Sequence, residues 1–170
     1  RIMQEPGMKP LERPQISRHE TRQTPPYRDG QSMNDLGFCE QFTVWAVRTQ
    51  WPHGENTEET GLIDDAFAAL DLPEGCHLVA DFTKALKQTV SRPLVIPEPT
   101  TPRLTHDEAQ MLRFLAGLQG LAQCEGTPCL ASPAWRPALR LVIALNAAGL
   151  HFGRRWYESA SFPEALPQLH

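Results

Sequence analysis

The chain has 170 residues, of which 41% are hydrophobic and 21% are charged, and its formal net charge is −4. These values are typical of one globular domain and exclude an intrinsically disordered chain, and four cysteines are too few for a small secreted disulfide scaffold. The negative charge argues against a general nucleic-acid binder, and the apolar run Leu141–Leu145 is far shorter than the roughly 20 residues of a membrane span. We therefore expect a protein of the cytoplasm with no membrane segment.

The first 33 residues differ from the rest of the chain. They show no helical periodicity and contain five prolines: Pro6, Pro10, Pro14, Pro25 and Pro26. They hold six Lys or Arg and four acids, whereas residues 34–170 hold ten and sixteen. This predicts an extended, basic arm (residues 1–33) attached to a single helical domain (residues 34–170). Ordering such an arm costs on the order of 1 kcal/mol per residue, so contacts with its own body, a second copy or a partner protein must offset that cost.

Three helices are predicted in the first half of the domain, over residues 35–50, 61–70 and 76–90. In each, apolar residues recur at steps of three and four, as expected for a helix with one buried face. The predicted buried stripes are Phe38, Phe42, Trp45 and Thr49 in the first helix, Leu62, Ile63, Ala66, Phe67 and Leu70 in the second, and Leu78, Val79, Phe82, Leu86 and Val90 in the third. The first helix ends at Trp51 because the residue before a proline avoids the helical conformation.

Residues 91–104 separate this half from the next. Their prolines exclude a helix, so we predict a crossover that joins two helical halves. Thr105 and Glu108 then form a capping box, which predicts the start of a helix that continues to about Ala122. Its predicted inward residues are Met111, Leu112, Leu115, Leu118 and Leu121. Within it, Gly117 and Gly120 would permit the close approach of another helix.

The most apolar helix is predicted over residues 137–148. Between residues 138 and 150 only Arg140 and Asn146 are polar, which is typical of a helix surrounded by others in a core. Pro137 is predicted to open this helix and Gly149 to end it as a left-handed cap. The sequence therefore predicts an all-α fold, a small bundle of about five main helices with a Pro-rich crossover and an extended N-terminal arm, in which helix 137–148 is the central element.

Four cysteines are candidate metal ligands: Cys39, Cys76, Cys124 and Cys129. Four thiolates can bind a zinc ion or an iron–sulfur cluster, but structural zinc sites favour two close pairs, and only Cys124 and Cys129 are close in sequence. A disulfide between those two is a second interpretation. The spacing favours a third, in which the cysteines are free thiols that pack as small apolar side chains.

A basic and aromatic cluster surrounds the last predicted helix. It comprises Arg136, Arg140, Arg154, Arg155, Trp156 and Tyr157, and the first two share a helix face because they are four residues apart. Such side chains form hot spots in protein interfaces, contact phosphates and stack on bases, or simply pair with an acidic body. For this acidic chain we favour pairing or protein contact over nucleic acid.

No catalytic motif was found. The chain has no Gly-rich phosphate loop, no Gly-x-Ser-x-Gly elbow and no histidine pair at helical spacing, and its paired carboxylates sit at predicted helix starts, where the helix dipole explains them. We therefore expect a non-enzymatic interaction protein without a cofactor, an accessory subunit or small regulator of a larger assembly, which contacts a protein partner or a second copy through its N-terminal arm. The alternatives are a cysteine-based metal-binding or redox accessory protein and a DNA-binding regulator.

Overall fold

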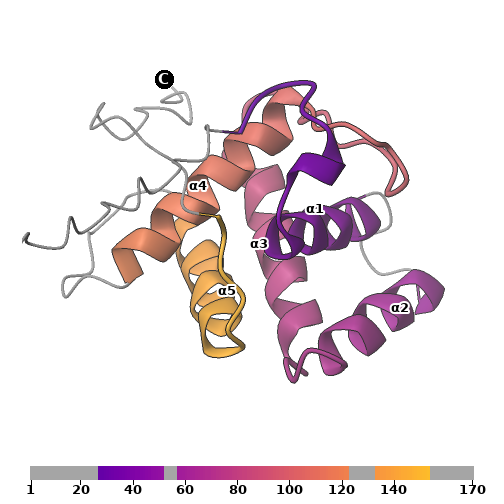
Figure 1. Ribbon diagram of the computed structural model, residues 1–170, viewed down its shortest axis with the longest axis vertical. Helices are drawn as coiled ribbons and strands as arrows, with labels where there is room; N and C mark the ends of the chain where they lie inside the picture. The colour runs from indigo at the N-terminus through magenta and orange to yellow at the C-terminus, as the bar shows by residue number, and fades with distance from the viewer. Residues whose placement is uncertain (1–26, 52–56, 123–132, 154–170) are drawn as a thin grey trace, which may run out of the picture.

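The structure is a computed structural model that describes residues 27–51, 57–122 and 133–153, with side chains described at all of these except 57–60 and 121–122. Within these ranges the chain forms five α-helices and one short 3-10 helix, with no strand (Figure 1). The elements are η1 (Met33–Asp35), α1 (Phe38–Gln50), α2 (Thr57–Ala68), α3 (Gly75–Thr89), α4 (His106–Ala122) and α5 (Trp135–Ala147). The prediction of an all-α bundle of about five helices is confirmed. None of these described helices is long and apolar enough to cross a membrane.

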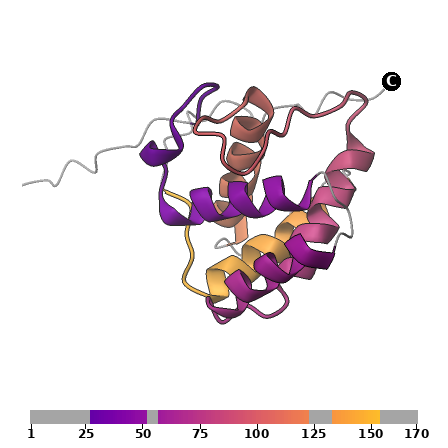
Figure 2. The same cartoon turned by 90° about the vertical axis from the view of Figure 1, so that its right-hand side faces the viewer.

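The helix that contacts most of the others is α3. It packs against α1, α2 and α5, and α5 packs in turn against α4 (Figures 1 and 2). Four of the five residues predicted for the stripe of α3, Leu78, Val79, Phe82 and Leu86, are buried, while Val90 is the half-buried C-cap of the helix. By contrast, α5 is not the surrounded central helix that we predicted. It buries one face, and Ile143 on another face is 52% exposed.

The first helix starts later than predicted. Residues Met33–Asp35 form η1, which Ser32 caps by accepting a hydrogen bond from the backbone N–H of Asn34 at 3.3 Å. Only after an extended residue, Gly37, does α1 begin. It ends at Gln50 with Trp51 as its C-cap, as the following proline predicted.

The buried faces predicted for α1 and α2 are partly wrong. In α1 the residue at the head of the predicted stripe, Phe38, is 60% exposed, and in α2 the side chain of Leu62 is 62% exposed. The residues of α2 that reach the core are Ile63 and Phe67. Periodicity identified both helices as amphipathic, but their many apolar residues left the direction of the core open.

The boundary that was clearest in the sequence is also clear in the structure. The Thr105 hydroxyl accepts a hydrogen bond from the Glu108 N–H at 3.2 Å, and a Glu108 carboxylate oxygen accepts one from the Thr105 N–H at 2.9 Å. The predicted capping box is therefore confirmed, and α4 runs from His106 to Ala122. Four of its five predicted inward residues are buried: Met111, Leu112, Leu115 and Leu118.

The last helix begins at Trp135, two residues before the predicted start at Pro137. Because the first N–H groups of a helix have no partner within it, a proline at the third position removes no helical hydrogen bond. The predicted end is confirmed, since Gly149 has a φ of +74°. The Leu150 N–H donates to the Leu145 carbonyl at 2.8 Å, and the Gly149 N–H donates to the Asn146 carbonyl at 3.0 Å, which is a Schellman motif.

A close approach between helices occurs at Gly75 instead of at the two glycines of α4. A Cβ atom added to Gly75 would lie 2.0 Å from Cδ1 of Phe67, so a side chain there would push α2 away from α3. Gly117 and Gly120 have no described neighbour within 4 Å of such an atom. Within the described part of the chain, no helix packs closely against these two glycines, so that expectation is wrong there.

Residues 27–36 and the segment between α3 and α4 lie side by side. The backbones of Gly30 and Gln31 exchange hydrogen bonds of 2.9 Å with Leu104, and the Met33 N–H donates to the Pro102 carbonyl. The segment is also fixed to the start of α4, because Asp107 accepts from the Val95 N–H at 2.8 Å and forms an ion pair with Arg92. The described end of the predicted arm therefore lies against the predicted crossover.

Candidate interaction surfaces

An exposed row of side chains on α5 contains two of the predicted interaction residues. Arg136, Arg140, Ile143 and Ala147 are spaced by four, three and four residues, so they share one face of α5, and all four are exposed. Arg140 lies 3.5 Å from a carboxylate oxygen of Asp81 on α3, with both side chains more than half exposed. Such a pair contributes little to stability, so it leaves Arg140 available to a partner. The other predicted residues, Arg154, Arg155, Trp156 and Tyr157, lie outside the described residues.

Two of the predicted metal ligands, Cys39 and Cys76, are described. Each is the second residue of its helix, and both are buried free thiols. Burial, with the neighbouring Glu40 charge, raises the pKa of Cys39 to about 12, although a hydrogen bond from Thr43 opposes the shift. Burial, with a hydrogen bond to Asp64 and its charge, raises the pKa of Cys76 to about 11. Both are therefore protonated at neutral pH, whereas the thiolate is the metal-binding form.

The metal hypothesis needs all four cysteines. Cys124 and Cys129 lie outside the described residues, so the distances between the two pairs are not part of the described structure. Among the residues that are described, no three His, Cys, Asp or Glu side chains are grouped to hold a metal ion. The four-cysteine site therefore depends on the position of Cys124 and Cys129 as well as on the two buried thiols.

A row of aromatic side chains on α1 forms a surface that the sequence did not predict. We call Phe38, Phe42 and Trp45 the aromatic row. Successive ring centroids are 5.8 and 5.7 Å apart, and Phe42 also meets the edge of Phe67 of α2 at 4.9 Å. Phe38 is exposed, and Phe42 and Trp45 are half-buried. Phe67 thus supports the middle of the row, while its outer faces meet solvent.

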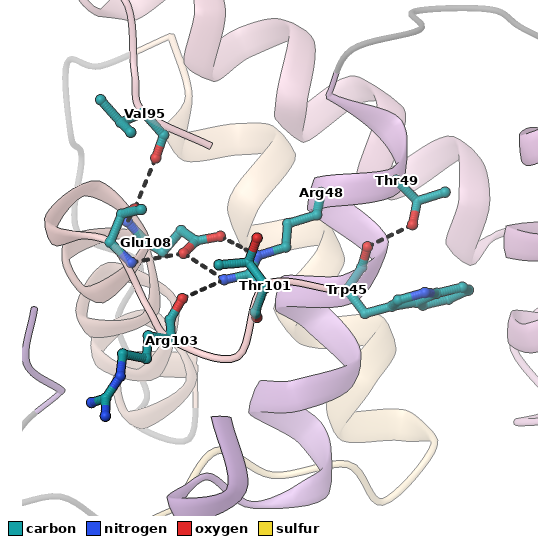
Figure 3. Close-up of polar contacts among 8 residues, drawn as sticks. Trp45, Arg48, Thr49, Val95, Thr101, Arg103 and Glu108 are labelled. Carbon is teal, nitrogen blue, oxygen red and sulfur yellow. Dashed lines mark hydrogen bonds and ion pairs between the residues drawn. The ribbon is translucent and has the colours of Figure 1, made fainter. Parts of the chain in front are cut away.

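The aromatic row lies opposite the buried face of α1. With 3.6 residues per turn, the row falls within a strip of about 60°, while Glu40 and Val47 point about 180° away from it. In Figure 3 the side chain of Arg48 extends toward Glu108, whereas that of Trp45 extends away from it. The two charged residues of α1, Glu40 and Arg48, are both buried. The exposed side of α1 therefore carries no charge.

Comparison with protein-family models, with curated proteins and with solved structures found no match to this chain. The assignment of function therefore depends on the geometry of these surfaces and on what fixes them in place.

A buried ion pair fixes the last turn of α1. Arg48 Nε lies 2.6 Å from Glu108 Oε1 and Nη2 lies 2.9 Å from Oε2, with neither side chain exposed (Figure 3). Two further N–H groups of Arg48 donate to the carbonyls of Thr101 and Arg103, at 2.6 and 2.9 Å. A buried charge pair is tolerated when additional hydrogen bonds accompany it, and these contacts hold Arg48 on the crossover as well as on α4.

A second buried carboxylate fixes the start of α1. Glu40 Oε1 accepts hydrogen bonds from the Tyr27 hydroxyl at 2.9 Å and from the Gly153 N–H at 2.7 Å. Among the described residues, its Oε2 is buried without a hydrogen-bond partner. Space is tight, because a Cβ on Gly37 would come within 2.6 Å of Oε2. Glu40 therefore joins the first and last described segments of the chain to one turn of α1.

Sequence reasoning missed the aromatic row because it placed those residues in the core. The sequence did contain a warning, because α1 has a second apolar row, Val44 and Val47, on its other side. With two apolar rows, the periodicity does not determine which one faces the core. The buried charges Glu40 and Arg48 had no such signal. Their partners are separated from them by 113 and 60 residues in the chain.

Proposed function

We propose that this chain is a non-enzymatic interaction protein, an accessory subunit or small regulator, which binds a partner protein through the aromatic row of α1. The observation that carries this proposal is the uncharged, solvent-facing side of α1, along which Phe38 stacks on Phe42 and Phe42 is tilted against Trp45. Aromatic residues are enriched in the cores of protein interfaces and charged residues are depleted there. A contiguous apolar surface on a water-facing helix is typical of a binding site.

The contacts that hold α1 in place also favour binding of a partner to the row. Its helix is held by the Arg48–Glu108 pair and by Glu40, and at its end Lys87 of α3 donates to the Trp51 carbonyl at 2.6 Å and lies 4.9 Å above the Trp51 ring. A surface on a rigid element loses little conformational entropy when a partner binds. The exposed face of α5 with Arg136, Arg140 and Ile143 offers a second contact region to a large partner.

The test is the capture of partner proteins by the full chain from cells that naturally make it. We compare the wild type with Phe38→Ser and, as a matched control, with Leu62→Ser, which removes an equally exposed apolar side chain from α2. Truncating a hot-spot residue costs about 2 kcal/mol or more, so Phe38→Ser should reduce capture about thirtyfold. Leu62→Ser should leave it unchanged, and circular dichroism should show that both variants are folded.

Two outcomes contradict the proposal. One is a partner that the wild type captures and that both variants, and also the double variant Phe38→Ser/Trp45→Ser, retain in full. The other is equal loss in both single variants, which would show that general surface hydrophobicity, not the aromatic row, causes capture.

A further inference from the structure

We propose that the chain's own N-terminal arm, residues 1–26, covers the aromatic row of α1 and competes there with the partner. This inference rests on the proposed function, because it gives the regulation of that surface. Three observations carry it: the charge of the chain around the row, the composition of the arm, and the point at which the arm joins the body.

The row lies beside a strongly acidic part of the chain. Residues 49–83 contain eight acidic residues and no Lys or Arg. They include all of α2, whose Phe67 touches Phe42 of the row, and on that helix Asp64 and Asp65 are exposed. Since α1 adds no exposed charge of its own, the surface is apolar along α1 and negative along α2. Its complement is a segment that is apolar and basic.

The arm has this composition. Residues 1–26 contain five Lys or Arg and three acids. Its large apolar residues are Ile2, Met3, Met8, Leu11 and Ile16. With this excess of positive charge and these apolar residues, the arm is complementary to the surface. Attraction between opposite charges a few ångströms apart near a protein surface is favourable and is weakened by salt.

The arm is also tethered within reach of the row, although its anchor contacts the opposite side of α1. Tyr27 is fully buried, its hydroxyl donates to Glu40 in the first turns of α1, and its carbonyl accepts from Nε of Arg113 on α4 at 3.0 Å. A helix of 13 residues is about 20 Å long, so the whole row lies within about that distance along α1 from the anchor. Twenty-six extended residues reach up to about 85 Å.

The tether decides which copy supplies the arm. Covalent attachment at Tyr27 gives the arm an effective concentration near its own α1 on the order of millimolar. A second copy would have to exceed that concentration to compete, so we assign the arm to its own chain. Because binding must order the arm, which costs free energy for each residue fixed, the cover is reversible and a partner can displace it.

The experiment replaces Phe38 in the full chain with the photo-reactive residue p-benzoylphenylalanine. The control places the same residue at Leu62, which is equally exposed on α2. After irradiation of the pure protein, peptides linked to each position are identified by mass spectrometry. We expect position 38 to link to residues 1–26 within species of monomer mass, at least about fivefold more than position 62. The double variant Arg13→Glu/Arg18→Glu, or a rise from about 50 to about 500 mM salt, should reduce that yield several-fold.

The inference is overturned if links from position 38 fall mainly in a second copy of the chain, or on its own helices, or do not exceed the control. Its failure is distinguishable from failure of the proposed function. If capture of a partner depends on Phe38 while no link to residues 1–26 forms, the row binds partners without a cover. If the cover exists, Arg13→Glu/Arg18→Glu should increase capture several-fold, and unchanged capture would show that the arm does not compete.

Discussion

The carboxylate of Glu108 in α4 forms an ion pair with Arg48 of α1 and also completes the capping box of α4. Glu108 Oε2 accepts from Arg48 Nη2 at 2.9 Å and from the Thr105 N–H at 2.9 Å, while Oε1 accepts from Arg48 Nε at 2.6 Å. A local signal for the start of a helix is therefore also the counter-charge for a buried cation 60 residues earlier in the chain. One side chain thus couples the start of α4 to the ion pair that joins α4 to α1.

This coupling predicts an unusually costly substitution. Glu108→Gln keeps the size of the side chain but leaves the buried Arg48 cation without a counter-charge, so we expect a loss of about 3–5 kcal/mol in the free energy of unfolding. The matched control, Thr105→Ala, removes only the cap hydroxyl and should cost about 1 kcal/mol. The double variant Arg48→Met/Glu108→Leu should recover much of the loss. Urea unfolding measures all three, and equal losses in Glu108→Gln and Thr105→Ala would refute the coupling.

The Tyr27–Glu40 contact predicts a measurable interaction between two side chains. A hydrogen bond to a charged acceptor contributes about 1.5–3 kcal/mol, so Tyr27→Phe should lower the free energy of unfolding by that amount. With Glu40→Gln already present, the acceptor is neutral and the same change should cost only about 1 kcal/mol. A double-mutant cycle in urea gives the difference. A cost for Tyr27→Phe that does not depend on residue 40 would mean that the carboxylate does not hold the arm's anchor.

The features that could be predicted from the sequence are those that depend on residues close together in the chain. The capping box of Thr105 and Glu108, the end of α1 before a proline and the left-handed cap at Gly149 all follow from contacts within a few residues, and all are present. The buried stripe of α3 could be predicted because the opposite face of the helix, which includes Asp81 and Lys84, is charged. With apolar residues on one side only, periodicity gives the direction of the core as well as the helix.

The candidate site was hidden because α1 is apolar on two sides. The row of Phe38, Phe42 and Trp45 has the same spacing as a core stripe, and larger side chains usually mark the buried face. The structure buries the smaller Val44 and Val47 completely, and beside Val44 the buried Arg48 reaches Glu108 of α4. That choice depends on a residue of another helix, which no local pattern contains.

The ion pair of Arg92 with Asp107 predicts a pH dependence. The hydrogen bond from Arg92 is the main cause that lowers the pKa of Asp107 below its ordinary 3.8, helped by the Val95 N–H and opposed by burial. A carboxyl group whose folded pKa is lowered adds stability above its unfolded pKa, and this stability is lost as the pH falls through the folded value. The difference in the free energy of unfolding between wild type and Arg92→Ala should therefore be constant from pH 7 to about 5 and shrink below about pH 4.

The control for this titration is Arg140→Ala, which breaks the exposed pair with Asp81. That pair is screened by solvent, so its removal should change stability little at any pH. Urea unfolding across the pH range gives both curves. A difference for Arg92→Ala that stays constant down to pH 2 would show that the contribution of Arg92 comes from its uncharged contacts, such as the bond to the Pro93 carbonyl.

The buried thiols predict which cysteines react. The thiolate is the reactive form, so raising the pKa of Cys39 from 9.0 to about 12 lowers its reactive fraction near pH 8 about a thousandfold, and the value of about 11 for Cys76 lowers it about a hundredfold. Burial slows both further. In the native protein, alkylation mapped by mass spectrometry should therefore modify Cys76 slowly and Cys39 more slowly still, whereas in urea both should react at the rate of an ordinary thiol.

The same measurement separates free thiols from metal ligands. A thiol protected by burial alone stays protected when a strong chelator is added, because its proton and its packing are unchanged. A thiolate protected by zinc becomes reactive when the chelator removes the ion. Chelator-independent protection of Cys39 and Cys76 is therefore the expected result. Rapid alkylation of both after chelation, with release of about one zinc ion per chain, would instead support the metal-binding alternative and require Cys124 or Cys129 to lie beside them.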